Sequence, residues 1–130
     1  MQFTVALFGE AQKGEFQMAY YCQTLAELSD FFGEPPSEEC QGLQFAVQTL
    51  LYERGVIYFR VHEEGFSIQD YLQGFNFLEK SEAFPNISAI GLPGVGSTEI
   101  IKATEDVCQI HKSFLILTEQ DLYDFLTASP

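Results

Sequence analysis

Basic residues are scarce in this sequence. Six lysines and arginines stand against 19 aspartates and glutamates, which leaves a formal net charge of −13 at pH 7. Binding to the phosphates of DNA or RNA needs the opposite sign of charge, so the sequence predicts no nucleic-acid partner. An anionic membrane surface is disfavoured for the same reason. A basic protein partner fits this charge, as for an acidic inhibitor or immunity-like protein that masks such a partner.

Cysteine is also scarce and scattered, at positions Cys22, Cys40 and Cys108. This odd number without a CxxC spacing predicts reduced, mostly buried thiols, as in a cytosolic protein. Residues 1–9 contain no basic residue, and their apolar run is shorter than a signal peptide or a membrane span requires. We therefore expect a cytoplasmic protein that does not associate with membranes.

Sequence signatures of catalysis are missing as well. The chain has no GxSxG elbow, and Ser97 has no recognisable base. Its acidic residues do not follow DxD or EF-hand spacing, so we predict no metal site. No cofactor is indicated by any pattern in the chain.

What the chain does contain is apolar material for a core. It has 130 residues, the size of one ordinary domain, and 46% of them are hydrophobic, including 13 phenylalanines. The clearest break is the EPPS stretch at residues 34–37, which is too short to link two domains. Residues 1–130 are therefore predicted to form a single α/β domain.

Helices are predicted where a capping residue precedes an apolar stripe. Thr24 and Glu27 form a capping box that starts one helix, and Gly33 is expected to end it. Ser37 is expected to cap a second helix. The predicted core stripe of that second helix is Cys40, Leu43, Val47, Leu50 and Leu51.

Short apolar runs predict strands, and further capping residues predict the remaining helices. The strands are expected at residues 3–8, 56–61, 87–90 and 113–117, and the helices after Ser67, over residues 98–111, and after Thr118. Residues 16–22 fit either strand alternation or helical spacing, and we favour a strand followed by a short helix.

From residue 37 onward, helices and strands alternate, which predicts a parallel sheet with right-handed crossovers. The near-continuous apolar strands predict that helices cover both faces of this sheet. We therefore expect a three-layer α/β/α architecture of the Rossmann-like or flavodoxin-like kind. Its mostly parallel sheet would have four or five strands, with an antiparallel hairpin near the N-terminus as one option.

The strongest candidate for a ligand loop is residues 87–98 (ISAIGLPGVGST). A strand, a glycine-rich turn and a helix follow one another there, a layout that can hold an anion on backbone N–H groups. Gly94 and Gly96 would permit close approach of a ligand, and Ser97 and Thr98 would add hydroxyl donors. Glu99 opposes an anion, because its charge lies in the first helical turn. A tight turn that needs glycine is the alternative interpretation.

Residues 91–98 resemble the phosphate-binding P-loop pattern GxxxxGK[ST] in their glycine spacing. However, Ser97 stands in the lysine position of that pattern, and this lysine is the group that reaches the terminal phosphates. We therefore do not expect nucleotide hydrolysis.

A second constellation follows the strand at residues 56–61. In parallel sheets, ligands bind beyond the carboxyl ends of the strands. Arg60 and His62 share one face of their strand, and Glu10, Glu63 and Glu64 follow strand ends. In an enzyme, Arg60 would clamp an anion, His62 would act as acid or base, and Glu63 or Glu64 would be its partner. The alternative is a structural ion pair of Arg60 with a nearby carboxylate.

Three classes of function remain open on the sequence alone. The strong acidity and the lack of a catalytic set favour a non-catalytic interaction or regulatory protein. The alternatives are a binder of phosphate or carboxylate ligands through the Gly91 to Thr98 loop, and an enzyme with the Arg60, His62 and Glu63 site. A homodimer is also expected if Phe66, Phe77 or Tyr20 lies outside the core.

Overall fold

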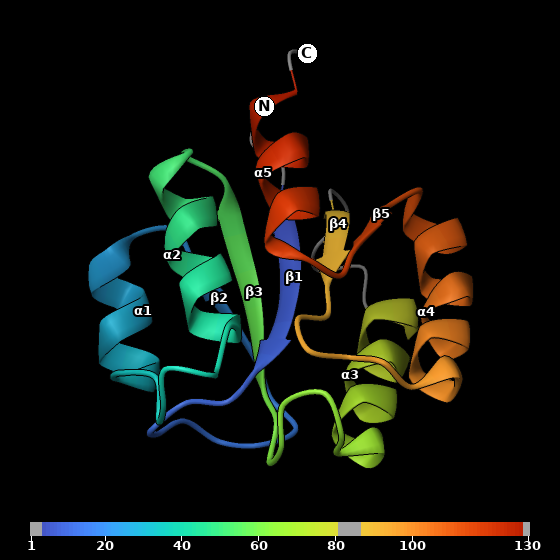
Figure 1. Cartoon of the computed structure of the whole chain (residues 1–130), viewed down its shortest axis with the longest axis horizontal. Helices are drawn as coiled ribbons and strands as arrows, with labels where there is room; N and C mark the ends of the chain where they lie inside the picture. Colours follow the sequence, from blue (N-terminus) through green and yellow to red (C-terminus); the bar gives the residue numbers. More distant parts are fainter. Residues whose placement is uncertain (1–3, 81–86, 129–130) are drawn as a thin grey trace.

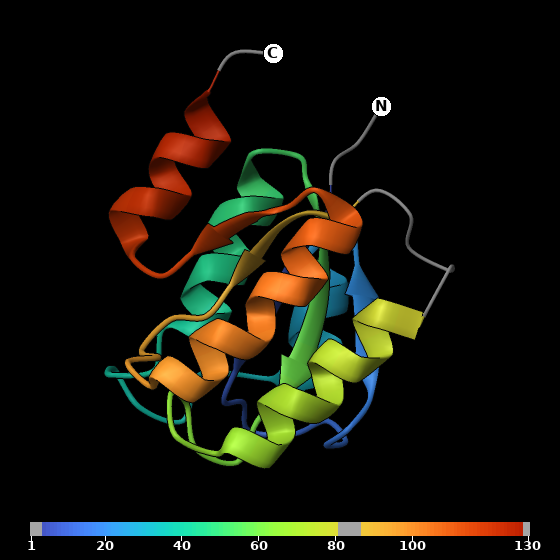
Figure 2. The same cartoon turned by 90° about the vertical axis from the view of Figure 1, so that its right-hand side faces the viewer.

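The structure, a computed structural model, describes residues 4–80 and 87–128. In this part of the chain, five strands form one sheet, and helices cover both of its faces (Figures 1 and 2). The predicted three-layer architecture with a mostly parallel sheet is therefore confirmed. Phe3, the first residue of the first predicted strand, lies outside the described residues.

The strand order in the sheet is β2-β3-β1-β4-β5. β1 (Thr4–Gly9) lies between β3 (Gly55–Arg60) and β4 (Ile87–Gly91) and runs parallel to both. β5 (Phe114–Ile116) pairs in parallel with β4 at one edge, and β2 (Ala19–Cys22) pairs antiparallel with β3 at the other. Residues 19–22 are thus a strand, as we favoured.

An antiparallel strand is present near the N-terminus, but it does not form a hairpin with the first strand. β2 is antiparallel, but Tyr20 pairs with Tyr58 of β3 and not with a residue of β1. β1 is the central strand, with parallel neighbours on both sides, so it has no free edge for a hairpin partner. β3 lies between β1 and β2, so β2 is the outer strand on that side of the sheet.

Each face of the sheet carries its own set of helices. α1 (Leu25–Phe32), α2 (Gly42–Leu51) and α5 (Glu119–Thr127) contribute side chains to the core on one face. α3 (Ile68–Lys80) and α4 (Thr98–His111) cover the other face, which Figure 2 shows toward the viewer. None of the helices in the described part of the chain is both long and apolar enough to cross a membrane.

Successive residues of β1 point to opposite faces and so build two cores. Val5 and Leu7 pack beneath α1, α2 and α5, whereas Ala6 and Phe8 pack beneath α3 and α4. Gly74 of α3 lies directly over Phe8, and a Cβ at this glycine would clash with the phenylalanine ring. Gly74 therefore allows α3 to approach the sheet closely.

Two helices begin at side chains that the sequence predicts as caps, Thr24 and Thr118. Thr24 accepts a hydrogen bond from the Glu27 N–H at 3.2 Å, and Glu27 accepts one from the Thr24 N–H, which completes the capping box of α1. Thr118 caps α5 by accepting from the Asp121 N–H. Ser97, which the sequence indicates only as a ligand donor, caps α4 by accepting from the Ile100 N–H. Local hydrogen bonding alone thus determines where these helices start.

α2 does not begin at Ser37, as predicted, but at Gly42. Residues 37–40 form a turn closed by a hydrogen bond from the Cys40 N–H to the Ser37 carbonyl. Gln41, which precedes the helix, makes no side-chain capping bond. The cap of α2 therefore comes from a distant part of the chain.

The predicted core stripe of α2 is also partly wrong. Leu43 and Leu50 are buried, but Val47 is 38% exposed and Leu51 is 65% exposed. Their places in the core are taken by Phe45, Ala46 and Thr49. The sheet buries one face of α2, whereas Val47 and Leu51 continue an apolar stripe on a face that points away from it.

Candidate functional site at the carboxyl edge of the sheet

The carboxyl ends of β1, β3 and β4 meet at one edge of the sheet, at the bottom of Figure 1. The helices that follow β1 lie on one face of the sheet, whereas the helices that follow β3 and β4 lie on the other. Such a switch in the direction of the connections is where open α/β sheets bind ligands.

A hollow of about 400 Å³ lies at this edge. We call it the acidic hollow, because four carboxylates and no basic side chain are found among the described residues of its wall. Its lining residues are Glu10, Ser37, Glu39, Cys40, Gln41, Glu63, Glu64, Phe66 and Gly94.

The carboxylate of Glu64 occupies the N-terminus of α2. One of its oxygens accepts a hydrogen bond from the Gln41 N–H at 2.6 Å. The other accepts from the Gly42 N–H at 3.0 Å and from the Glu10 N–H at 3.2 Å. The first N–H groups of a helix have no intrahelical acceptor and carry its positive partial charge. Glu64 therefore caps α2 and fills the position that an anionic ligand would take.

Glu10 returns the interaction. Its carboxylate accepts a hydrogen bond from the Glu64 N–H at 2.9 Å. Beneath this pair, the buried Tyr58 hydroxyl donates to the Glu10 carbonyl oxygen at 3.1 Å. The loops after β1 and β3 are thus joined by reciprocal bonds between side chains and backbone.

Two glycines permit this arrangement. A Cβ added to Gly42 would clash with the Tyr58 hydroxyl and would lie only 2.6 Å from the Cα of Gly9. A Cβ on Gly9 would meet the same hydroxyl and the Glu64 carboxylate. Strand β1 and helix α2 therefore touch through bare backbone beside the Glu64 carboxylate.

Burial shifts the titration of the groups in this region. Burial raises the pKa of the Glu64 carboxyl, the three N–H donors counteract this, and the charge of Glu10 adds to the rise. Burial also raises the pKa of the Cys40 thiol, which Ser37 opposes through a hydrogen bond and which the charges of Glu10 and Glu64 reinforce. The Cys40 thiol is therefore protonated at neutral pH and is not activated as a nucleophile.

Arg60 lies elsewhere, beside β2. Its Nε donates to the Ala11 carbonyl at 3.1 Å, and its Nη1 donates to the Gly14 carbonyl at 2.6 Å. Its guanidinium also lies 4.4 Å from the centre of the Phe16 ring. Among the described residues, this guanidinium bonds to backbone carbonyls of the loop after β1 and not to a carboxylate, so the alternative of a structural ion pair is wrong.

His62 joins Arg60 at the same aromatic ring. The imidazole stacks on Phe16, with ring centres 3.6 Å apart, and its Nδ1 lies 2.8 Å from a carboxylate oxygen of Asp70. Asp70 also accepts from the His62 N–H at 2.7 Å. Burial disfavours the Asp70 carboxylate, but these bonds outweigh it and lower the pKa of Asp70. The partner of His62 is thus Asp70, in the first turn of α3, and not Glu63 or Glu64.

The glycine loop contributes one residue to the acidic hollow. Gly94 has a φ of 80° and faces Glu64. Gly96, Ser97 and Thr98 do not line the hollow, and the Ser97 hydroxyl accepts from the Ile100 N–H of its own helix at 3.5 Å. Anion binding at this loop stays a prediction, but Gly94 faces Glu64 and lines a hollow that holds four carboxylates.

The structure therefore divides the predicted site residues into two groups. Glu10, Glu63, Glu64 and Gly94 come together in the acidic hollow, whereas Arg60 and His62 gather around Phe16. No group of three metal-ligating side chains occurs among residues 4–80 and 87–128.

Sequence reasoning missed the role of Glu64 as the cap of α2. The sequence offered no signal for it, because Ser37 is a plausible local cap and only the structure shows that the helix starts at Gly42 without a capping side chain or an acidic first turn. Such a helix start needs an acceptor from another part of the chain.

Comparisons with protein-family models, curated proteins and solved structures give no match to this chain. A function is therefore best argued from the chemistry of the acidic hollow itself.

Proposed function

We propose that this chain is a non-catalytic interaction protein whose acidic hollow binds a basic residue of a protein partner. The observation that carries this proposal is the position of the Glu64 carboxylate on the first N–H groups of α2. The site that would attract an anion in this fold is filled by the chain's own negative charge.

The electrostatics of the hollow favour a cation. Glu10 and Glu64 form its inner wall, and the exposed side chains of Glu39 and Glu63 add two more carboxylates. The whole chain adds a long-range attraction for cations, because its net charge is −13. The carboxylates of the hollow would contact a partner's lysine or arginine, and the net charge of the chain would speed its approach.

Phe66 favours arginine as the bound residue. This side chain is 70% exposed and borders the acidic hollow. A guanidinium stacks on an aromatic face and pairs with carboxylates at the same time. Arginine and exposed aromatic residues are also the groups that dominate the energetics of protein interfaces.

The side-chain chemistry supports binding over catalysis. The Cys40 thiol is held in its protonated form, and His62 is paired with Asp70 outside the hollow. The positions of Arg60 and His62 around Phe16 do not favour the alternative of an Arg60, His62 and Glu63 enzyme site. The three cysteines are free thiols, which supports a reducing compartment such as the cytoplasm.

The test is an NMR titration of the isotope-labelled protein with N-acetyl-arginine amide. We expect the largest shifts at the amides of Glu10, Gln41, Gly42 and Gly94. The neutral N-acetyl-glutamine amide should leave these signals unchanged. The double variant Glu39→Gln/Glu63→Gln should lose the shifts, because it keeps the shape of the hollow but removes two charges.

The matched control is Glu105→Gln/Asp106→Asn, which removes two exposed charges from α4. This variant should respond to the arginine derivative as the wild-type protein does. Shifts spread evenly over all acidic surfaces, or equal losses in both double variants, would contradict a specific site.

A further inference from the structure

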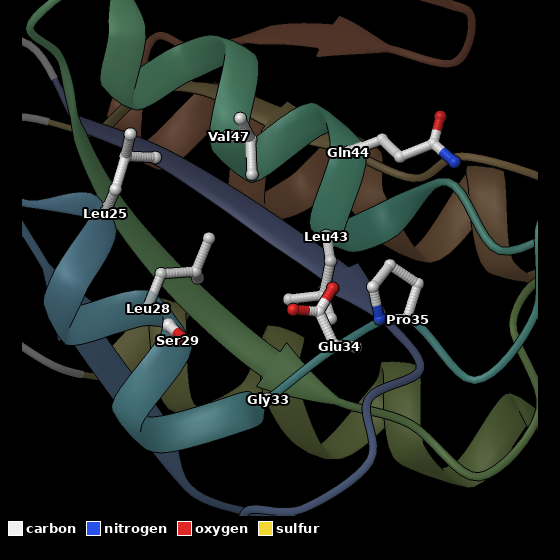
Figure 3. Close-up of a pocket in the computed structure, with 9 residues that line it drawn as sticks. All are labelled: Leu25, Leu28, Ser29, Gly33, Glu34, Pro35, Leu43, Gln44 and Val47. Atoms are coloured by element: carbon white, nitrogen blue, oxygen red, sulfur yellow. The ribbon is translucent and has the colours of Figure 1, made fainter.

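A second hollow, of about 320 Å³, lies between α1 and α2 on the outer side of one helical layer. Figure 3 shows Leu25 and Leu28 of α1 facing Leu43 and Val47 of α2 across it. We call this hollow the α1/α2 groove. The other residues in its lining are Ser29, Gly33, Glu34, Pro35 and Gln44.

The surface of the α1/α2 groove is apolar and open. Leu25 is 43% exposed, and Val47 and Leu51 are exposed one helical turn apart on α2. Val47 and Leu51 belong to the α2 stripe that the sequence alone assigns to the core. The sheet buries Leu43 and Leu50 of this stripe but leaves Val47 and Leu51 exposed.

Charge is absent from α2 altogether. Its ten residues, GLQFAVQTLL, include no acid or base, although the chain has 19 acidic residues. A helix exposed to solvent on one face normally carries charged residues there. Depletion of charge together with exposed aliphatic side chains is typical of the central part of a protein interface.

The charge at one end of the groove indicates what covers it. Glu34 lines that end, and the same loop continues through Glu38 and Glu39 to the wall of the acidic hollow. A partner with apolar residues followed by basic ones would match both surfaces. A second copy of this chain would not, because neither α1 nor α2 has a basic residue to face Glu34.

We propose that the α1/α2 groove binds an amphipathic helical segment of a basic protein partner. Its apolar side chains lie between Leu25 and Val47, and its lysine or arginine residues lie at the Glu34 end, toward the acidic hollow. This is helix-in-groove recognition with a charged end that sets the direction of the segment. The proposal rests on the proposed function, because the acidic hollow receives the basic end.

The test is a selection from a displayed library of random peptides, each long enough for about four helical turns. Enriched peptides should combine apolar residues at helical spacing with lysine or arginine near one end. Their affinity, measured by fluorescence anisotropy, should fall at least about tenfold in Val47→Lys, which places a charge in the groove. Leu25→Lys repeats the test from α1 if Val47→Lys does not fold.

The matched control is Phe114→Lys, which places the same charge at an exposed apolar residue of β5. It should bind the enriched peptides as the wild-type protein does. The inference is overturned if no peptide is enriched, or if Val47→Lys and Phe114→Lys bind equally well. It is also overturned if the wild-type protein dimerises in light scattering and Val47→Lys is monomeric, because a second copy would then be the occupant.

The outcomes separate this inference from the proposed function. If basic peptides bind Glu39→Gln/Glu63→Gln more weakly but bind Val47→Lys as tightly as the wild-type protein, binding in the α1/α2 groove is contradicted and binding in the acidic hollow is supported. Enriched peptides that lack basic residues and lose affinity only in Val47→Lys would contradict the basic partner of this inference, and the titration with N-acetyl-arginine amide would still decide the proposed function.

Discussion

The carboxylate of Glu64 accepts a hydrogen bond from the N–H of Gly42 at 3.0 Å, across 22 positions of sequence. This contact joins the loop after β3 to the first turn of α2. It satisfies N–H groups that local sequence leaves without an acceptor, and it reverses the charge that this helix end presents.

Loss of this cap is expected to destabilise the fold. Glu64→Ala removes the acceptor of three backbone N–H groups, and we expect the free energy of unfolding to fall by about 1 to 3 kcal/mol. Urea denaturation measures the change. Glu63→Ala, at the exposed neighbouring residue, is the control and should stay within about 0.5 kcal/mol of the wild-type protein. Equal stability of the two variants would mean that Glu64 does not cap α2.

Removal of the Glu64 side chain should also uncover an anion site. Sulfate is expected to raise the melting temperature of Glu64→Ala more than that of the wild-type protein, because it binds to the freed N–H groups of Gln41 and Gly42. Chloride at matched ionic strength is the control for general salt effects. An identical response to sulfate in both proteins would show that this helix end has no affinity for anions.

The contact of β1 with α2 predicts that Gly42 cannot carry a side chain. Gly42→Ala would force its Cβ against the Tyr58 hydroxyl and the Gly9 backbone, and we expect a cost of about 1 to 3 kcal/mol in the free energy of unfolding. Gly96→Ala is the matched control, because a Cβ there has no neighbour within 4 Å. Thermal unfolding of the two variants decides the matter, and similar losses in both would argue against the tight contact.

The pairing of Asp70 with His62 predicts part of the acid sensitivity. The pKa of Asp70 is lowered in the folded protein, whereas the pKa of an aspartate in an unfolded chain is about 3.9. At low pH the unfolded state therefore binds more protons than the folded state. The full contribution of Asp70 to the free energy of unfolding is present above about pH 3.9, and it is lost as the pH falls through the lower pKa of the folded state.

In Asp70→Asn, the free energy of unfolding should therefore fall less steeply as the pH is lowered from about 5 to about 2. Denaturant unfolding at a series of pH values measures the slope, and the exposed Asp106→Asn is the control. If Asp70→Asn leaves the slope of the free energy of unfolding against pH unchanged, the bonds from His62 to the Asp70 carboxylate do not contribute to the acid sensitivity.

Local rules predicted the parts of the fold that depend on neighbouring residues. The capping side chains of Thr24 and Thr118 place the starts of α1 and α5, because donor and acceptor lie within three positions of each other. The partner of β2 could not be read in this way. Its pairing with β3 depends on which edge of the sheet is free, and that is a property of the whole topology.

The same limit applies to the candidate site. The sheet-edge rule correctly placed Glu10, Glu64 and Gly94 near one another, because strand ends in a parallel sheet share an edge. It could not tell that Arg60 turns toward Phe16, since that depends on the path of the loop that reaches β2. The apolar stripe of α2 predicted the burial of Leu43 and Leu50, but it could not show that Val47 and Leu51 of the same stripe are exposed.

The most direct test of the central claim is the coupling between a cationic ligand and the carboxylates of the acidic hollow. N-acetyl-arginine amide and its neutral citrulline analogue are titrated into the wild-type protein and into Glu39→Gln/Glu63→Gln, and the four dissociation constants form a thermodynamic cycle. We predict a favourable coupling free energy of about 1 kcal/mol or more, because the charge of the ligand faces these carboxylates. Coupling within about 0.3 kcal/mol of zero would contradict the claim that the acidic hollow recognises a basic residue.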